Sequence, residues 1–169
     1  MHIEPLGTQE RSRFASGQPE MDDWFRHRAG QDQRRGLARV FVAVDDSLGV
    51  VGFYSVSSWA LRLRDLPPDI GRKLPRYPLV PAILIGRLAR DERVRGQRIG
   101  DFLLGDAIVR IVRAADSVGT FAIAVEAKDE SAAALYLRFA FRRLPEAPLS
   151  LYLPMSIAVA SVAQSLTPP

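Results

Sequence analysis

The most informative part of the sequence for the fold is residues 81–115, which read PAILIGRLARDERVRGQRIGDFLLGDAIVRIVRAA. Its first part, Pro81 to Leu88, has the apolar character of a buried strand. From Asp101 to Ala115 the apolar side chains recur at the spacing of one helical face; they are Leu103, Leu104, Ala107, Ile108, Ile111, Val112 and Ala115. The stretch therefore predicts a strand, a basic loop that contains glycine, and a helix.

The loop between this strand and this helix combines two features of phosphate-binding sites. Backbone N–H groups converge at the start of a helix, where the helix dipole also favours an anion. Positive charge comes from four arginines, Arg90, Arg93, Arg95 and Arg98. The alternative is an ordinary turn with a solvated run of charge, and the P-loop pattern is absent. These residues alone leave both interpretations open.

The rest of the chain predicts further strands and helices around this stretch. Five prolines between residues 66 and 81 exclude a regular helix or a central strand there, so we interpret that segment as an ordered loop or long insertion. The other expected elements are strands over 3–6, 38–44, 50–58, 121–127 and 150–153, and helices over 19–35 and 131–139, with Asp129 as N-cap of the last helix. We expect one α/β (α+β) domain over residues 1–169, with a mixed central β-sheet flanked by helices.

The composition is that of a globular protein and excludes several kinds of site. The chain has 169 residues, of which 47% are hydrophobic and 25% charged. It has no cysteine and only two histidines, so disulfides, thiolate nucleophiles and histidine-rich metal sites are excluded, and we expect no metal. Residues 1–30 show no secretory signal, and the apolar stretch 149–163 falls short of the ~20 residues of a membrane span. We expect a cytoplasmic protein without a membrane partner.

Arginine dominates the basic residues. Of 23 basic residues only Lys73 and Lys128 are lysine, which leaves 21 arginines, and the net charge is +4. The planar guanidinium group suits phosphate, so a phosphate-rich partner is one explanation. A GC-rich genome that encodes arginine in place of lysine is the other.

Tyr136 is a candidate proton donor. The chain has no cysteine and no well-placed histidine, and a phenol stays protonated at neutral pH because its ordinary pKa is about 10. Taken alone, a tyrosine within the segment ALYLRFAF (134–141) is equally explained as a packed aromatic residue.

Together, the loop and the tyrosine segment resemble the GCN5-related N-acetyltransferases (the GNAT family). The stretch Arg95-Gly96-Gln97-Arg98-Ile99-Gly100 is similar to the family's Q/R-x-x-G-x-G/A loop, and the stretch from Asp129 to Phe141 is similar to its N-x-x-A-x-x-x-Y-x-x-x-G-F pattern. The resemblance covers residues 37 to 153. Three positions depart from the pattern: Arg98 and Ala140 stand in place of glycines, and Asp129 in place of asparagine. We expect an unstrained backbone at Arg98, whose side chain can face a phosphate.

The resemblance implies a mechanism that uses acetyl-CoA as co-substrate. It implies that the strand end Leu88, Ala89 and Arg90 presents backbone groups to the acetyl and pantetheine part. It implies that Arg95 to Gly100 holds the pyrophosphate, with Asp129 as a further cofactor contact or only a helix cap. Tyr136 is implied as the group that protonates the departing thiolate.

The N-terminal half narrows the resemblance to the GNAT toxins of type II toxin–antitoxin modules. The segments that carry it are MDDWF (21–25), AGQD (29–32), ARVFVA (38–43), GFYSVS (52–57) and the proline-rich segment that runs into LIGRLA (84–89). These toxins acetylate the α-amine of aminoacyl-tRNA and so block translation. The partners implied are aminoacyl-tRNA and a ribbon-helix-helix antitoxin. A homodimer is the assembly to be expected.

Two other readings of the sequence stay open. One is a GNAT enzyme that acetylates a small amine or a protein N-terminus. The other is a module that binds CoA without catalysis, which the departures at Arg98 and Ala140 allow.

Overall fold

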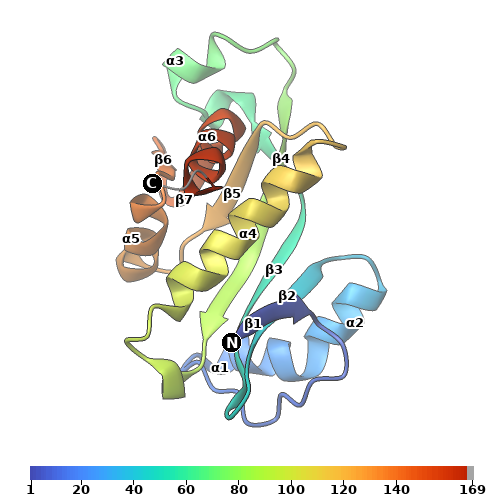
Figure 1. The fold of residues 1–169 in the computed structure, drawn as a ribbon. Coiled ribbons are helices and arrows are strands. Elements are labelled where there is room, and N and C mark those ends of the chain that lie inside the picture. The colour runs from blue at the N-terminus through green and yellow to red at the C-terminus, as the bar shows by residue number, and fades with distance from the viewer. Residues whose placement is uncertain (167–169) are drawn as a thin grey trace. The chain divides into compact units, whose positions relative to one another are not determined.

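The structure is a computed structural model and describes residues 1–166. Its seven strands form one sheet in the order β1-β2-β3-β4-β5-β7-β6. The strands are β1 (His2–Pro5), β2 (Arg39–Asp45), β3 (Gly49–Arg62), β4 (Leu79–Arg90), β5 (Ala122–Glu126), β6 (Arg142–Leu144) and β7 (Ala147–Pro154). The α-helices are α1 (Pro19–Asp23), α2 (Ala29–Arg34), α3 (Pro68–Gly71), α4 (Ile99–Ala115), α5 (Glu130–Arg138) and α6 (Met155–Leu166). The expected fold class, a mixed sheet with flanking helices, is confirmed (Figure 1).

The chain divides into two compact units, which we describe separately. Unit 1 comprises Met1–Ser57 and Ile85–Ala107, and unit 2 comprises Ser58–Leu84 and the chain from Ile108 onward. The long elements β3, β4 and α4 contribute residues to both units.

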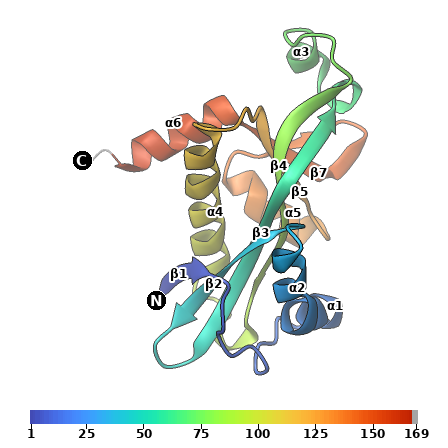
Figure 2. The ribbon, with the colours of Figure 1, turned by 90° about the vertical axis from the view of Figure 1, so that its right-hand side faces the viewer.

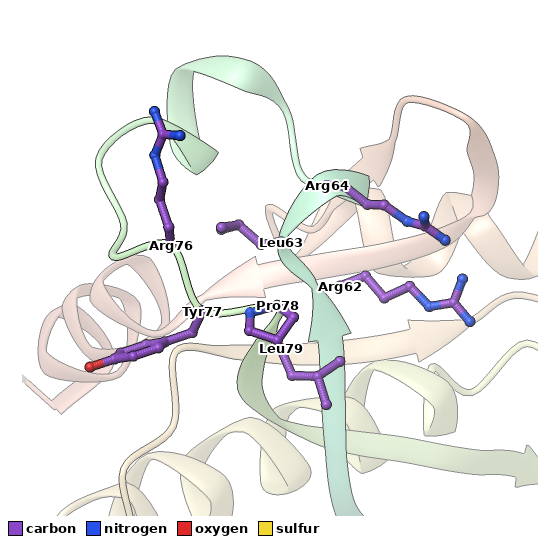
Figure 3. Close-up of a pocket in the computed structure, with 7 residues that line it drawn as sticks. All are labelled: Arg62, Leu63, Arg64, Arg76, Tyr77, Pro78 and Leu79. Atoms are coloured by element: carbon purple, nitrogen blue, oxygen red, sulfur yellow. The ribbon is translucent and has the colours of Figure 1, made fainter.

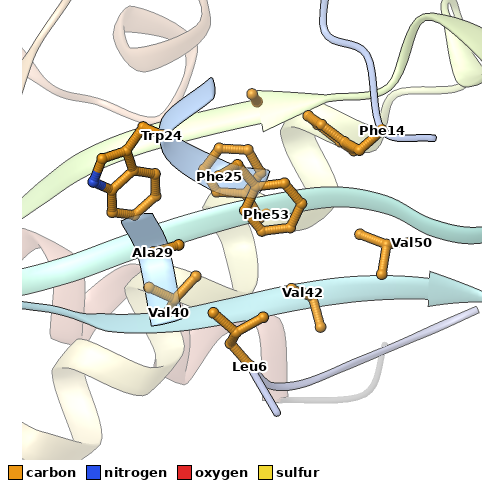
Figure 4. Packing of buried hydrophobic residues seen from close by; sticks show 10 residues of the cluster. Leu6, Phe14, Trp24, Phe25, Ala29, Val40, Val42, Val50 and Phe53 are labelled. Atoms are coloured by element: carbon orange, nitrogen blue, oxygen red, sulfur yellow. The ribbon is translucent and has the colours of Figure 1, made fainter. Parts of the chain in front are cut away.

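Unit 1 is built around an antiparallel hairpin and an aromatic cluster. β1, β2 and β3 pair antiparallel, and the turn after β2 is held by Asp45, whose Oδ1 accepts hydrogen bonds from the N–H groups of Ser47 and Leu48. On one face of the hairpin, the Phe25 ring stacks on Phe53 with centroids 4.0 Å apart (Figure 4). Such packing fixes the helical segment 19–34 against the hairpin.

Unit 2 is built on the antiparallel strands β5, β7 and β6. Its core contains Leu61, Leu66, Val80 and Tyr152. The helix α3 is a single turn that follows a 3-10 turn, Leu63–Asp65, at the far ends of β3 and β4 (Figure 2). We call residues 58–84, which hold these ends and the chain between them, the insertion.

Several sequence expectations need correction. The strands 38–44, 50–58, 121–127 and 150–153 and the helix after the basic loop are confirmed with shifted ends. Two elements were missed: β6, which has only three residues, and α6, which begins directly after Pro154. A proline at the boundary ends the strand without preventing a helix from starting, because the first helical N–H groups need no partner within the helix. The proline-rich segment also holds one helical turn, α3, and β4 begins within it at Leu79.

Candidate functional site

In unit 1, the loop between β4 and α4 is fixed by backbone hydrogen bonds at its start. The N–H of Asp91 donates to the carbonyl of Val51, and the N–H of Glu92 donates to the carbonyl of Ala15, both at 2.8 Å. Within the strand end, Ala89 is buried while Leu88 and Arg90 are half-buried. The chain thus leaves β4 along a defined path before it reaches α4.

Gly52 allows the first turns of α4 to approach the hairpin closely. A Cβ atom at this position would lie 2.9 Å from Cδ1 of Leu103, 3.2 Å from Cγ2 of Ile99 and 3.3 Å from the carbonyl oxygen of Ala89. A side chain here would force Leu103, Ile99 or the Ala89 carbonyl to shift, so glycine at this position allows the helix start to lie this close to the end of β4. Sequence reasoning did not single out this residue for that role.

Most of the loop arginines are paired with acids. Arg93 binds the buried carboxylate of Asp91 through Nε at 2.8 Å and through Nη2 at 2.9 Å. Arg95 contacts Glu92 at 3.2 Å, and Arg98 contacts Asp101 at 2.7 Å. Carboxylates of the protein itself therefore neutralise most of the positive charge that these arginines bring to the loop.

Asp91 holds the loop together. Burial by itself would raise the pKa of this carboxyl, but hydrogen bonds from the Arg93 side chain and from the N–H groups of Arg93 and Ala15 outweigh burial and lower it. Its side chain also starts the 3-10 turn Glu92–Val94. No role was assigned to Asp91 from the sequence; an acid at a strand end two residues before an arginine is the signal that could have identified it.

The second half of the loop turns through two left-handed residues. Gly96 has φ +82° and Arg98 has φ +57°, so the expectation of an unstrained backbone at Arg98 is wrong. The position is one that glycine adopts freely and that costs other residues about 1 kcal/mol. Residues 95–98 are exposed while Ile99 is buried, which anchors the helix start and leaves the turn facing solvent. The N–H groups of Ile99 and Gly100 have no acceptor within α4, as in any first helical turn. This arrangement can bind an anion through backbone amides.

In unit 2, Asp129 and Tyr136 lie at the two ends of α5. The Oδ1 atom of Asp129 accepts a hydrogen bond of 2.8 Å from the N–H of Ala132, which makes Asp129 the N-cap as expected. Its role as a cofactor contact stays a prediction.

Tyr136 is held by the motif that ends α5. The N–H of Phe141 donates to the carbonyl of Tyr136, and the N–H of Ala140 donates to the carbonyl of Leu137. This is the pair of bonds of a Schellman motif, whose turning residue is normally glycine. Here that residue is Ala140, with φ +66°. The Phe141 ring lies 5.6 Å from the Tyr136 ring, so the motif positions the tyrosine side chain.

Burial keeps the Tyr136 phenol protonated. The residue is 7% exposed, and burial raises its pKa to about 12. It can therefore act as a hydrogen-bond or proton donor throughout the neutral range.

Two aromatic residues from the segments that carry the resemblance lie in the core of unit 1. Tyr54 is fully buried, and its hydroxyl hydrogen-bonds to the carboxylate of Asp106. Trp24 is also buried, donates to Asp32 at 2.8 Å and lies under the Arg87 guanidinium. Both are packing residues.

Residues 1–166 contain neither a cluster of side chains suited to a metal ion nor a helix with the length and apolar run of a membrane span.

Comparison with known proteins gives clear relatives, although no protein-family model matches the chain. The chain is 42% identical over 149 residues to a tRNA-acetylating toxin of Mycobacterium tuberculosis, covering 88% of each protein. It is 33% identical over 164 residues to the probable toxin TacT of Sinorhizobium fredii, covering 91% of each.

Solved structures share the fold. A tyrosine-to-phenylalanine mutant of KacT matches with a TM-score of 0.89 and 24% identity, over 95% of this chain and 98% of that one. AtaT complexed with acetyl-methionyl-tRNAfMet matches with a TM-score of 0.85 and 24% identity, over 98% of this chain and 99% of that one. With its amide-lined loop and the identities to the two curated toxins, the chain belongs to the tRNA-acetylating toxins of the GNAT family.

Proposed function

We propose that this protein transfers the acetyl group of acetyl-CoA to the α-amine of the amino acid on an aminoacyl-tRNA and thereby blocks translation in the cytoplasm. The observation that carries the proposal is the 42% identity to a tRNA-acetylating toxin over almost the whole chain. Residues 1–169 act as one catalytic domain in this proposal. A ribbon-helix-helix antitoxin is the proposed protein partner, and a homodimer the proposed assembly.

The loop of unit 1 is proposed to bind acetyl-CoA through the pyrophosphate group of this co-substrate. The residues proposed to bind it are Arg95, Gly96, Gln97, Arg98, Ile99 and Gly100. Support comes from the left-handed residues at 96 and 98, which turn the chain just before the N–H groups of Ile99 and Gly100, and these have no acceptor within α4. Apart from its two chain neighbours, no described residue has an atom within 4 Å of a Cβ built on Gly96, so the space beside the turn is open to a ligand.

The strand end before the loop is proposed to bind the thioester part. Leu88, Ala89 and Arg90 would present backbone N–H and carbonyl groups to the pantetheine chain, as a neighbouring strand would. A backbone N–H at this point would stabilise the negative charge that develops on the thioester oxygen in the transition state.

Tyr136 is proposed as the general acid. Acetyl-CoA supplies an activated thioester, and the phenol of Tyr136 would give its proton to the thiolate that leaves. A pKa of about 12 ensures that the proton is present at neutral pH. The α-amine of an aminoacyl ester has a lowered pKa and is partly neutral, so the chain needs no histidine as general base.

The deciding experiment offers the purified protein acetyl-CoA together with a pool of charged tRNAs, and in a parallel reaction a polyamine and an aminoglycoside. Mass spectrometry should find acetyl-aminoacyl-tRNA and no acetylated small amine. Efficient acetylation of the small amines without any labelled tRNA would instead identify a small-molecule acetyltransferase.

Binding of the co-substrate is tested separately by thermal melting. Acetyl-CoA at 100 times its dissociation constant should add about 2.7 kcal/mol to the free energy of unfolding. An unchanged melting temperature at saturating acetyl-CoA would remove the proposed role of residues 95–100.

A further inference from the structure

The insertion of unit 2 carries an open pocket of about 510 Å³ that the proposed chemistry does not use. Its lining comes from the end of β3, the 3-10 turn after it and the segment that leads into β4: Arg62, Leu63, Arg64, Arg76, Tyr77, Pro78 and Leu79 (Figure 3). We call it the arginine–tyrosine pocket.

A backbone hydrogen bond and a cluster of buried side chains fix the base of this pocket. The N–H of Leu63 donates to the carbonyl of Pro78 at 3.1 Å, which joins the two sides of the insertion. Beneath them, Leu61, Leu66 and Val80 are buried, and Leu63 packs against their cluster. The pocket therefore stands on a packed support, and its side chains project from fixed backbone positions.

The charge of the pocket is unbalanced. The insertion has five basic and two acidic residues, a net +3, compared with +4 for the whole chain. Within residues 1–166, Arg62 and Arg76 form no ion pair, and Arg64 lies 3.8 Å from Asp65, a separation at which an exposed pair contributes little. Three guanidinium groups thus face solvent with their hydrogen-bond donors available to an anion.

An aromatic and apolar surface adjoins these charges. Tyr77 is 69% exposed and Leu79 is 56% exposed, although both are large apolar side chains. Figure 3 shows the Tyr77 ring directed to one side of the connection between Leu63 and Pro78, and Arg62 and Arg64 directed to the other. A compact anion would meet only one side, whereas an extended polyanion that also carries flat rings would meet both.

We propose that the arginine–tyrosine pocket is a binding site for the tRNA strand, with phosphates on Arg62, Arg64 and Arg76 and an unpaired base stacked on Tyr77. The inference rests on the proposed function for the identity of the RNA. Arginine forks combined with an exposed aromatic ring are the chemistry by which proteins hold single-stranded RNA. An acidic peptide, such as a segment of an antitoxin, would use the charges but has no need of the exposed ring face.

The test compares two pocket variants with a matched control. The first replaces Arg62, Arg64 and Arg76 by glutamine; the second is Tyr77→Ala. The control replaces Arg13, Arg113 and Arg142, which are also exposed, by glutamine. Each variant is assayed with charged tRNA at low and moderate salt, and with an amino-acid methyl ester, which has the α-amine but no RNA. Equal melting temperatures check that all variants fold.

The pocket triple variant should lose at least tenfold in kcat/KM for charged tRNA through KM, while its rate with the ester is unchanged. For this variant, the slope of log kcat/KM against log salt concentration should become shallower by about 2, because each phosphate contact that is lost removes a little under one from the slope. Tyr77→Ala should lose about tenfold with tRNA and keep the wild-type salt dependence, because stacking is not ionic. The control triple variant should stay close to wild type.

Two results would overturn the proposal. One is a pocket triple variant that behaves like the control triple variant. The other is unchanged tRNA kinetics with lost antitoxin binding, which would assign the pocket to a peptide. If the wild type acetylates no charged tRNA at all, the proposed function fails. Filter binding of uncharged tRNA to the same variants then still shows whether the pocket binds tRNA.

Discussion

The two arginine-rich regions of the molecule differ in what their guanidinium groups contact. In the loop after β4, Arg93, Arg95 and Arg98 each contact a carboxylate of the same loop or of the first turn of α4. In the arginine–tyrosine pocket, Arg62 and Arg76 have no such partner within residues 1–166. In the sequence the two regions are similarly rich in arginine, with four in the loop and three in the pocket.

The difference shows that arginine content does not identify the group that binds a phosphate. The loop arginines serve mainly to shape the turn, and the backbone N–H groups that they help to position are the better candidates for the pyrophosphate. Arg62 and Arg76 form no ion pair within residues 1–166 and are therefore available for a ligand. In the loop, Asp91, Glu92 and Asp101 lie two or three residues from the arginines they pair with. Among the described residues, Asp65 also lies three residues after Arg62 but forms no ion pair with it, so the spacing of acids does not by itself separate the two cases.

The largest effect should follow from removing the acid that organises the loop. Asp91→Ala leaves the N–H groups of Ala15 and Arg93 and the Arg93 guanidinium without their acceptor, which should cost about 3 kcal/mol of unfolding free energy. Urea denaturation at pH 7 measures it, with Asp46→Ala, an exposed carboxyl, as a control that should change little.

The same variant has a defined pH dependence. The pKa of Asp91 is lowered in the folded protein from its ordinary 3.8. The stability that the Asp91 carboxylate contributes is therefore fully present above pH ~4, and it is lost as the pH falls through the lowered pKa of this group in the folded state. The stability difference between wild type and Asp91→Ala should shrink in acid, and a difference of the same size at pH 3 and pH 7 would argue against this role.

The next effect concerns a side chain outside both arginine regions. Tyr136→Phe keeps the ring and its contact with Phe141 but removes the proposed proton donor, so kcat should fall on the order of 10². Acetyl-CoA binding, measured by calorimetry, should not change, because neither arginine region is altered. Tyr152→Phe, which also removes a hydroxyl from a buried tyrosine, is the matched control. Wild-type turnover in Tyr136→Phe would exclude it as general acid.

Sequence patterns predicted the parts of this fold that depend on local periodicity. The hairpin, α4 and the N-cap Asp129 follow from alternation, from the spacing of apolar residues and from capping chemistry. Contacts between residues distant in sequence were not predictable in this way. The bond from the Glu92 N–H to the Ala15 carbonyl joins segments 77 positions apart, and the close approach at Gly52 depends on a helix about 50 residues later.

The backbone conformation of individual residues was also not predictable from the sequence. The two positions where this chain replaces glycines of the family pattern, Arg98 and Ala140, are its only non-glycine residues with positive φ within residues 1–166. Both residues adopt the left-handed conformation that suits glycine, although this conformation costs free energy for a residue with a side chain. Sequence alone shows that a glycine is missing, but not whether the backbone changes with it.

The smallest expected effects come from restoring these glycines, and they sharpen the comparison between backbone and side-chain binding. Ala140→Gly should raise the unfolding free energy by about 1 kcal/mol, because glycine suits the turning position of a Schellman motif. Arg98→Gly should gain slightly less, because it also removes the exposed ion pair with Asp101, which is worth little. If the N–H groups of the loop hold the pyrophosphate, acetyl-CoA affinity of Arg98→Gly should stay within about twofold of wild type, as RT ln 2 is only ~0.4 kcal/mol. A tenfold loss of affinity, with Ala140→Gly unchanged, would show that the Arg98 guanidinium leaves Asp101 to bind the phosphate, and the contrast between the two arginine regions would then disappear.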